Sequence, residues 1–223
     1  MREKNLKKKY INNITKRNAW KIISRDKNKI FTMQYYRDKI KIWETAKYMM
    51  HYPVQEKIID KLFKDPKINE LVKIKILDNF YSTNLKEGIS KMYKNIVKKE
   101  AKERIARGDI KVVKDISKVG SNIYGKKECT SFSSKYCSRY NKSCFPIYDK
   151  YVKQMLCLIN QANNFFLKKV SYKELYDYEK YCDVVNAFIE KFYNQTKYKL
   201  SYKEFDRYIW TWAKEIIYKN NQL

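Results

Sequence analysis

Glycine, proline and histidine are scarce in this chain, which has four, three and one of them among 223 residues. Isoleucine, asparagine and tyrosine are abundant, so an A/T-rich coding sequence explains part of this composition. The single histidine, His51, follows Met49 and Met50 at the end of an apolar helical pattern. Helical ribonucleases that pair arginine with histidine need an arginine a few residues before the histidine. The nearest arginine upstream of His51 is Arg37. The sequence therefore disfavours this class of nuclease.

Long apolar runs are also lacking. No stretch approaches the roughly 18 apolar residues of a membrane-spanning helix. The basic opening segment, Met1 to Tyr10, is not followed by the apolar region that a secretory signal needs. We therefore expect a cytoplasmic protein with no membrane partner.

Paired cysteine motifs are absent as well. Five cysteines form an odd number with no C-x-x-C spacing, which favours neither a disulfide framework nor a zinc site. Iron–sulfur ligands would be more tightly clustered. We therefore expect free thiols, no metal and no cofactor. The five are Cys129, Cys137, Cys144, Cys157 and Cys182.

Basic residues are in large excess over acidic ones. The chain has 50 Lys and Arg against 24 Asp and Glu, a formal charge of +26. Such an excess produces a strong positive field, for which a polyanion is the natural partner. We expect nucleic-acid binding by a monomer that associates with the nucleoid when bound to DNA; the simpler alternative is a well-solvated basic surface. Residues 1–30 are expected to be a basic arm or peripheral segment.

Apolar residues recur at helical spacing along most of the chain, and 44% hydrophobic residues suffice for a core. No alternation typical of strands extends beyond a few residues. The sequence therefore predicts an all-α fold with one domain over 31–223. The expected helices in the first half are 40–52 ended or redirected by Pro53, 55–63, 69–80, 86–107 followed by a left-handed Gly108, and 110–119 capped by Asp109.

Two Ser-x-x-Glu capping boxes lie in the last third, at Ser171 to Glu174 and Ser201 to Glu204. In this motif each side chain satisfies an orphan backbone donor at a helix start. Two scaffold helices are expected to follow these boxes.

The central region holds the most informative pair, Lys135 and Asp149. Lys135 falls early in a helix expected over 132–140, and Asp149 stands at the cap position of another over 150–159. An amine and a carboxylate on adjoining helices suit covalent attack on a sugar carbon. The simpler interpretation is that Lys135 is one of many surface lysines and Asp149 only a helix cap.

The order of these parts resembles the helix-hairpin-helix DNA glycosylases, in particular the 8-oxoguanine glycosylase branch. In that family a lysine on the second hairpin helix precedes a loop, an apolar residue or two and an aspartate that starts the next helix. Lys135-Tyr136-Cys137 and Pro146-Ile147-Tyr148-Asp149 are similar to these parts, and the polar loop Ser82-Thr83-Asn84 is similar to the family's gap-filling loop. The resemblance covers about Leu71 to Leu158. It lacks the family's Gly-x-Gly, in whose place Thr130 to Ser134 stand, and implies a shortened helical barrel.

The resemblance implies a base-excision glycosylase acting on oxidised or otherwise modified bases in duplex DNA, with AP lyase activity through a lysine Schiff base. Lys135 would be the nucleophile, Asp149 its electrostatic partner and Asn84 the wedge behind an extruded base, with the hairpin and catalytic region at about 120–158. A basic DNA- or RNA-binding protein of the same fold without catalysis is the alternative. The implied DNA contacts are Ser82, Thr83, Asn84, Ser131, Ser133 and Ser134, and the implied base-pocket aromatics are Phe132, Tyr136, Phe145 and Tyr148.

Overall fold

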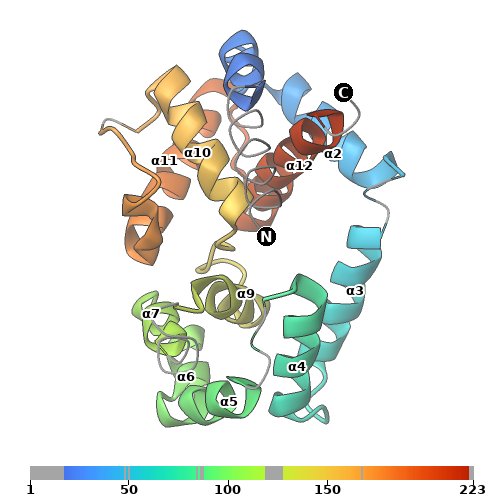
Figure 1. Ribbon diagram of the computed structural model, residues 1–223, viewed down its shortest axis with the longest axis vertical. Coiled ribbons are helices and arrows are strands. Elements are labelled where there is room, and N and C mark those ends of the chain that lie inside the picture. The colour runs from blue at the N-terminus through green and yellow to red at the C-terminus, as the bar shows by residue number, and fades with distance from the viewer. Residues whose placement is uncertain are drawn as a thin grey trace, which may run out of the picture.

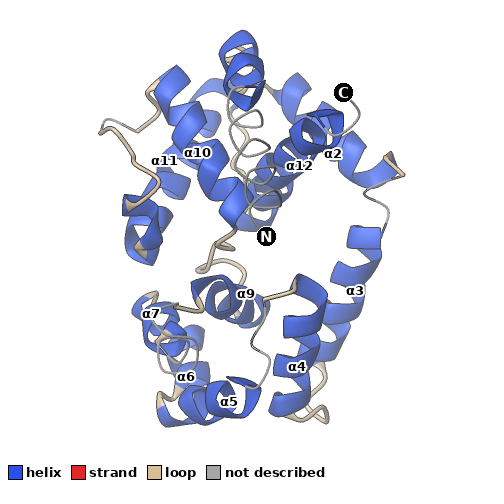
Figure 2. Cartoon of the chain, in the orientation of Figure 1, coloured by secondary structure: helices blue, strands red, loops and turns tan. Residues whose placement is uncertain are grey.

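The computed structural model describes residues 18–47, 49, 51–83, 85, 88–118, 128–166 and 168–220. Helices joined by turns and loops make up this part of the chain, and no residue within it lies in a strand (Figure 2). The predicted all-α class is therefore confirmed. No helix in the described ranges is both long and apolar enough to span a bilayer.

The helices form two groups that meet at α9 (Figure 1). One group packs α3, α4, α6 and α7 against α9, and the other packs α12 against α2 and α10. The α9 to α10 connection runs from the first group to the second. The bounds are α2 Met33–Thr45, α3 His51–Lys64, α4 Glu70–Tyr81, α5 Ile89–Lys98, α6 Ala101–Ala106, α7 Lys111–Ser117, α9 Thr130–Tyr140, α10 Lys150–Asn163, the 3-10 helix η2 Glu174–Tyr176, α11 Tyr178–Thr196 and α12 Tyr202–Asn220.

The start of the chain is more deeply packed than expected. Residues 18–26 are helical, and the side chains of Ala19, Ile23, Ile30 and Phe31 are buried in the core. The expectation that residues 1–30 form only a peripheral arm is therefore wrong for residues 18–30. Residues 1–17 lie outside the described part.

The helix predicted over 40–52 is interrupted earlier than expected. Helix α2 ends at Thr45, where Ala46 turns to an extended conformation with ψ of 126°. Helix α3 then begins at His51, so Pro53 lies in its first turn. A proline there costs no helical hydrogen bond, because the first N–H groups of a helix have no partner within it. Pro53 therefore neither ends nor redirects the helix expected over 40–52, and that prediction is wrong.

The single helix predicted over 86–107 is two helices, α5 and α6. Between them Glu100 takes a left-handed conformation with φ of 48°. The apolar spacing continues through this break, since Ala101 and Ile105 of α6 are as buried as Met92 of α5. Periodicity alone therefore could not locate the break.

The turn after α6 follows the prediction. Gly108 has φ of +74°, the left-handed region that glycine enters without steric cost. The side chain of Asp109 accepts a hydrogen bond of 3.0 Å from the backbone N–H of Lys111, at the start of α7. The helix predicted over 110–119 corresponds to α7.

Both predicted capping boxes form. The backbone N–H of Ser171 donates to Glu174 Oε2 at 2.7 Å, and that of Ser201 donates to Glu204 Oε2 at 2.8 Å. The reciprocal bonds to the two serine hydroxyls are each 3.2 Å. The second box starts α12. The first leads only into the single turn η2, and α11 begins after a new cap at Asp177.

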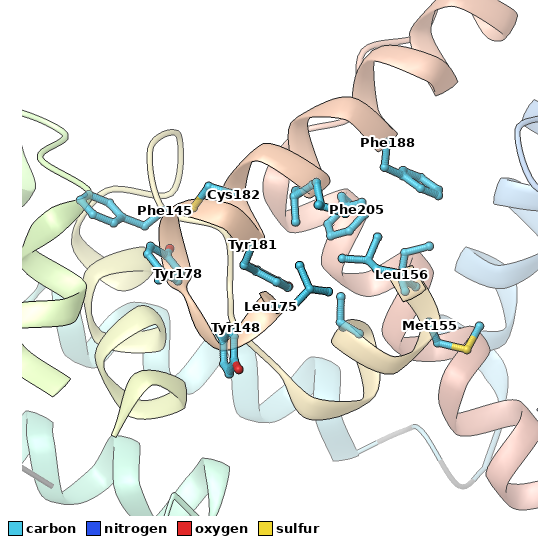
Figure 3. Packing of buried hydrophobic residues seen from close by; sticks show 14 of the residues in the cluster. Phe145, Tyr148, Met155, Leu156, Leu175, Tyr178, Tyr181, Cys182, Phe188 and Phe205 are labelled. Atoms are coloured by element: carbon cyan, nitrogen blue, oxygen red, sulfur yellow. The ribbon is translucent and has the colours of Figure 1, made fainter. Parts of the chain in front are cut away.

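The core of the second group is rich in aromatic rings. Side chains from α10, α11, α12 and the α9 to α10 connection converge in one cluster (Figure 3). Within it the rings of Phe188 and Phe205 lie 5.2 Å apart between centroids. The hydroxyl groups of Tyr178 and Tyr181 donate hydrogen bonds of 2.7 Å to the carbonyl oxygens of Pro146 and Ile147. These bonds fix the connection that carries Asp149.

Candidate active site

A cavity of about 560 Å³ lies between the two groups of helices, within the size range of small-molecule sites. Its lining comes from α3, the end of α4, α9, the start of α10 and α12, together with Trp43 of α2. Lys135 and Asp149 both line it. The predicted pair therefore meets in one cavity, although its members belong to helices of different groups.

Lys135 lies on α9, a helix that its neighbours enclose on nearly every side. The residue is 4% exposed, and its Nζ donates a hydrogen bond of 2.7 Å to the hydroxyl of Ser131. A longer contact of 3.4 Å leads to the carbonyl oxygen of Tyr148, and the ring of Tyr81 lies 5.3 Å from Nζ. The alternative interpretation of Lys135 as a surface lysine is therefore wrong.

The environment of Lys135 disfavours its charged form. Burial lowers the pKa of this amine, and the charge of Arg139 acts in the same direction. The carboxyl groups of Asp149 and Asp206 oppose that effect without cancelling it. A lysine with a lowered pKa has more of the neutral amine, which is the nucleophilic form.

Asp149 has two roles in the geometry. Its Oδ1 accepts a hydrogen bond of 2.7 Å from the backbone N–H of Tyr151, which caps α10 as predicted. The same residue lines the cavity. A carboxylate at this position is stabilised by the N-terminal end of the helix dipole.

A further ionisable residue of the cavity, Asp206 of α12, was missed by the sequence analysis. Its Oδ1 is shielded from solvent and has no hydrogen-bond partner in the described part of the chain. Burial, together with the charges of Asp149 and Glu56, raises the pKa of this carboxyl to about 8. The apolar pattern of 201–216 indicates a scaffold helix, and no local signal separates Asp206 from an ordinary exposed acid.

The aromatic walls of the cavity were also missed. Trp210 packs edge to face against Tyr52, with ring centroids 4.6 Å apart, and against Trp43 at 5.7 Å. All three rings line the cavity. They come from α2, α3 and α12, so nothing in the local sequence connects them.

Of the four predicted base-pocket aromatics, Tyr148 lines the cavity. Phe132, Tyr136 and Phe145 are at most 1% exposed and belong to the hydrophobic core instead. The prediction that these three line a base pocket is therefore wrong. For Phe132 and Tyr136 it failed because α9 buries nearly all of its side chains, so aromatic character there does not mark the cavity side. Phe145 lies in the connection from α9 to α10 and is buried in the same core.

The predicted DNA-contact residues also separate into some that line the cavity and some that are buried. Ser82 and Thr83 line the cavity, and Asn84 lies outside the described residues. The hydroxyl of Ser131 faces the cavity but accepts the bond from Lys135.

Ser133 and Ser134 are fully buried. The hydroxyl of Ser133 donates to the carbonyl oxygen of Cys129, and that of Ser134 accepts from the backbone N–H of Tyr148 at 3.0 Å. Direct phosphate contact by these two residues was therefore wrongly predicted. The hydroxyl of Ser134 instead ties α9 to the segment before Asp149, and that of Ser133 bonds within the start of α9.

Comparison with known proteins places the chain in a family. The family model HI_0787_N, described as an N-terminal domain, matches residues 32–144, a range that contains Lys135 and ends before Asp149 and Asp206. An uncharacterized protein of Haemophilus influenzae (strain ATCC 51907 / DSM 11121 / KW20 / Rd) is 35% identical over 165 residues, which cover 73% of this chain and 74% of the relative. No solved structure matches. Because the model spans about half of the chain and the relative is matched along most of it, the chain belongs to the HI_0787_N family.

Proposed function

We propose that this protein is a DNA base-excision glycosylase with AP lyase activity, in which Lys135 forms a Schiff base with the sugar. The observation that carries the proposal is the buried amine of Lys135, which shares a cavity with Asp149 and several aromatic rings. A buried lysine with a lowered pKa is suited to covalent catalysis at a carbonyl or acetal carbon. The net charge of +26 supports DNA as the partner.

The cavity provides for an extruded nucleotide. Base flipping costs a few kcal/mol, which stacking between aromatic side chains helps to offset. Trp43, Tyr52 and Trp210 offer such surfaces. Ser82 and Thr83 lie at the end of α4, where the DNA strand would approach the cavity.

The chemistry then uses two residues of the chain. The neutral amine of Lys135 attacks C1′, the glycosidic bond breaks, and the base leaves with the bonding electrons. Loss of the amine proton and opening of the sugar ring give an imine, from which β-elimination cleaves the strand on the 3′ side. Asp149 stabilises the positive charge that develops on the sugar.

A basic DNA- or RNA-binding protein without catalysis remains the second candidate, because the charge of +26 serves binding equally well. Both candidates predict an affinity that falls steeply with salt, by about 0.9 log units per phosphate neutralised for each log unit of salt. Salt dependence therefore does not separate them. Covalent chemistry at Lys135 does.

The test is borohydride trapping on labelled duplexes that carry 8-oxoguanine or an abasic site. Wild-type protein should form a covalent adduct, and Lys135→Gln should lose it while still binding DNA. Lys73→Gln is the matched control and should keep the adduct, because Lys73 is as buried as Lys135, yet it does not line the cavity and donates to the carbonyl oxygen of Phe63. Adducts of equal yield from Lys135→Gln would exclude Lys135 as the nucleophile. No adduct from any variant, with salt-sensitive binding retained, would leave the non-catalytic candidate.

A further inference from the structure

We propose that Asp206 is a second catalytic carboxyl group of this cavity, a general acid that gives its proton to the departing base. This inference rests on the proposed glycosylase activity and deepens it, because it identifies how the leaving group is activated. It also defines the class of base that the enzyme would release.

The acidic side chains that line the cavity differ in their partners. Glu56 is held by Arg207 at 2.7 Å and by Lys203 at 3.3 Å. Asp149 is engaged at the start of α10 through the N–H of Tyr151. In contrast, Oδ1 of Asp206 is buried without a hydrogen-bond partner among the described residues. Burying an oxygen atom without a partner costs an ionised carboxylate more than a neutral one, which favours the protonated form of Asp206.

Asp206 lies close along α12 to Trp210, one of the aromatic residues that line the cavity. Asp206 and Trp210 are one helical turn apart on α12, and both line the cavity. Residues four apart lie on the same face of a helix. The ring of Trp210, on which a base would stack, and the carboxyl group of Asp206 therefore lie on the same face of α12.

The surroundings of Asp206 favour the protonated form of its carboxyl group. Burial raises the pKa of Asp206 to about 8, and the charges of Asp149 and Glu56 add to this effect while Lys135 and Arg139 oppose it. Two further groups near this carboxyl, Tyr81 of α4 and Tyr181 of α11, have raised pKa values themselves. Asp206 is therefore largely a neutral acid at pH 7, able to donate a proton.

The carboxyl groups of Asp149 and Asp206 would have different catalytic roles. Where two carboxyl groups of a site lie in different environments, one commonly acts as the acid and the other as the charge stabiliser. Asp149, at the start of a helix, is suited to the ionised role. Asp206, buried near the carboxyl groups of Asp149 and Glu56, is suited to the protonated one.

Lys135 and Asp206 together account for every proton and bonding electron pair of this step. The bond from C1′ to the base nitrogen breaks with both electrons going to the base, and the proton of Asp206 moves to the base. Lys135 Nζ forms the new bond to C1′. The proton that Nζ then loses returns to the carboxylate of Asp206 and restores the acid. Such help is needed for neutral bases, such as oxidised or deaminated ones, whereas a base made cationic by alkylation departs without a proton.

The experiment compares wild type, Asp206→Asn and Lys135→Gln on two kinds of duplex. One kind contains a neutral modified base, either 8-oxoguanine, hypoxanthine or uracil, and base release is measured in single turnover. The other contains a preformed abasic site, and borohydride trapping is measured. An abasic site has no base to release, so its trapping needs Lys135 and the loss of one water from C1′, which takes its proton from solvent.

We expect Asp206→Asn to slow base release by about 100-fold or more, the usual size of a general-acid effect. Trapping at the abasic site should stay within about threefold of wild type, because the small leaving group there is water, which solvent can protonate. The wild-type rate of base release should also fall as the pH rises above about 8, and Asp206→Asn should lack this decline. Asp183→Asn, an exposed acid on α11, is the control and should behave as wild type.

Three results would overturn the assignment. Base release by Asp206→Asn at the wild-type rate would exclude a general acid at this position. Loss of both base release and abasic-site trapping would make Asp206 a structural residue. Wild-type trapping at abasic sites without release of any of the three bases would remove the general acid and leave the lyase standing. Failure of wild type in both assays would instead overturn the proposed function itself.

Discussion

Lys153 donates a hydrogen bond of 2.7 Å from Nζ to the hydroxyl oxygen of Tyr148. The same tyrosine lines the cavity and contacts Lys135 through its backbone carbonyl oxygen. Lys153 is 1% exposed, and its Nζ lies 3.4 Å from the ring centroid of Tyr176 and 3.9 Å from that of Tyr172. One residue therefore joins two buried lysines, of which Lys135 alone faces the cavity.

The buried amine of Lys153 should make stability depend on pH. Burial lowers its pKa from 10.5 to about 8, so the folded state holds this proton less tightly than the unfolded state. Between these two values the unfolded chain binds more protons, and the free energy of unfolding rises with pH. From pH 7.5 to 9.5, wild type should gain about 1–2 kcal/mol relative to Lys153→Met. Urea denaturation at both pH values measures this difference, and an equal response of the two proteins would contradict it.

Asp60 links three elements through ion pairs and should contribute to stability. Its carboxylate accepts bonds from Arg139 at 2.5 Å, Lys142 at 2.7 Å and Lys203 at 3.3 Å. Burial opposes its ionisation, but the bond from Lys142 and the charges of Arg139 and Lys203 lower its pKa to about 2. This stabilisation is present above the ordinary pKa of 3.8 and is lost as the pH falls toward 2.

Asp60→Asn should therefore lower the free energy of unfolding by about 1–2 kcal/mol at pH 7. The difference from wild type should shrink as the pH falls from 4 toward 2, as thermal or urea denaturation would measure. Asp183→Asn is the control, since Asp183 is exposed. Equal stability of Asp60→Asn and Asp183→Asn would mean that these ion pairs contribute little.

Local signals predicted much of the fold and half of the site. Caps at Asp149 and Ser201 and the left-handed Gly108 depend on residues within a few positions of each other, so sequence reveals them. Asp206 and Trp210 lie far along the chain from Lys135, and tertiary packing alone brings them together. Sequence reasoning could not find them.

The errors on α9 have a different cause. Helical patterns are interpreted by separating a buried face from an exposed one. From Phe132 to Arg139 every side chain of α9 is buried, so no exposed face exists. Serines and aromatic residues that were assigned to DNA and to the base pocket are enclosed by neighbouring helices instead.

Gly108 should tolerate no side chain. Its φ is +74°, and a Cβ there would lie 2.9 Å from the sulfur of Cys144. Gly108→Ala should cost about 1–3 kcal/mol from the backbone conformation and the close contact together. Cys144→Ala in the Gly108→Ala background removes the contact but not the backbone cost, so it should restore part of the loss. Denaturation of the two single variants and the double variant tests this, and strictly additive effects would show that the contact is not the cause.

The ring of Trp210 should contribute to recognition of the extruded base. It forms the cavity wall with Trp43 and Tyr52, and base stacking on an aromatic ring is worth about 1–3 kcal/mol. In a Lys135→Gln background, which prevents turnover, Trp210→Leu should weaken binding of an 8-oxoguanine duplex by about tenfold or more. Binding of the undamaged duplex should change little, because phosphate contacts dominate it. Fluorescence anisotropy measures both affinities, and Trp20→Leu, outside the cavity, should alter neither. An equal loss on both duplexes would assign Trp210 to the fold or to backbone binding and not to the base.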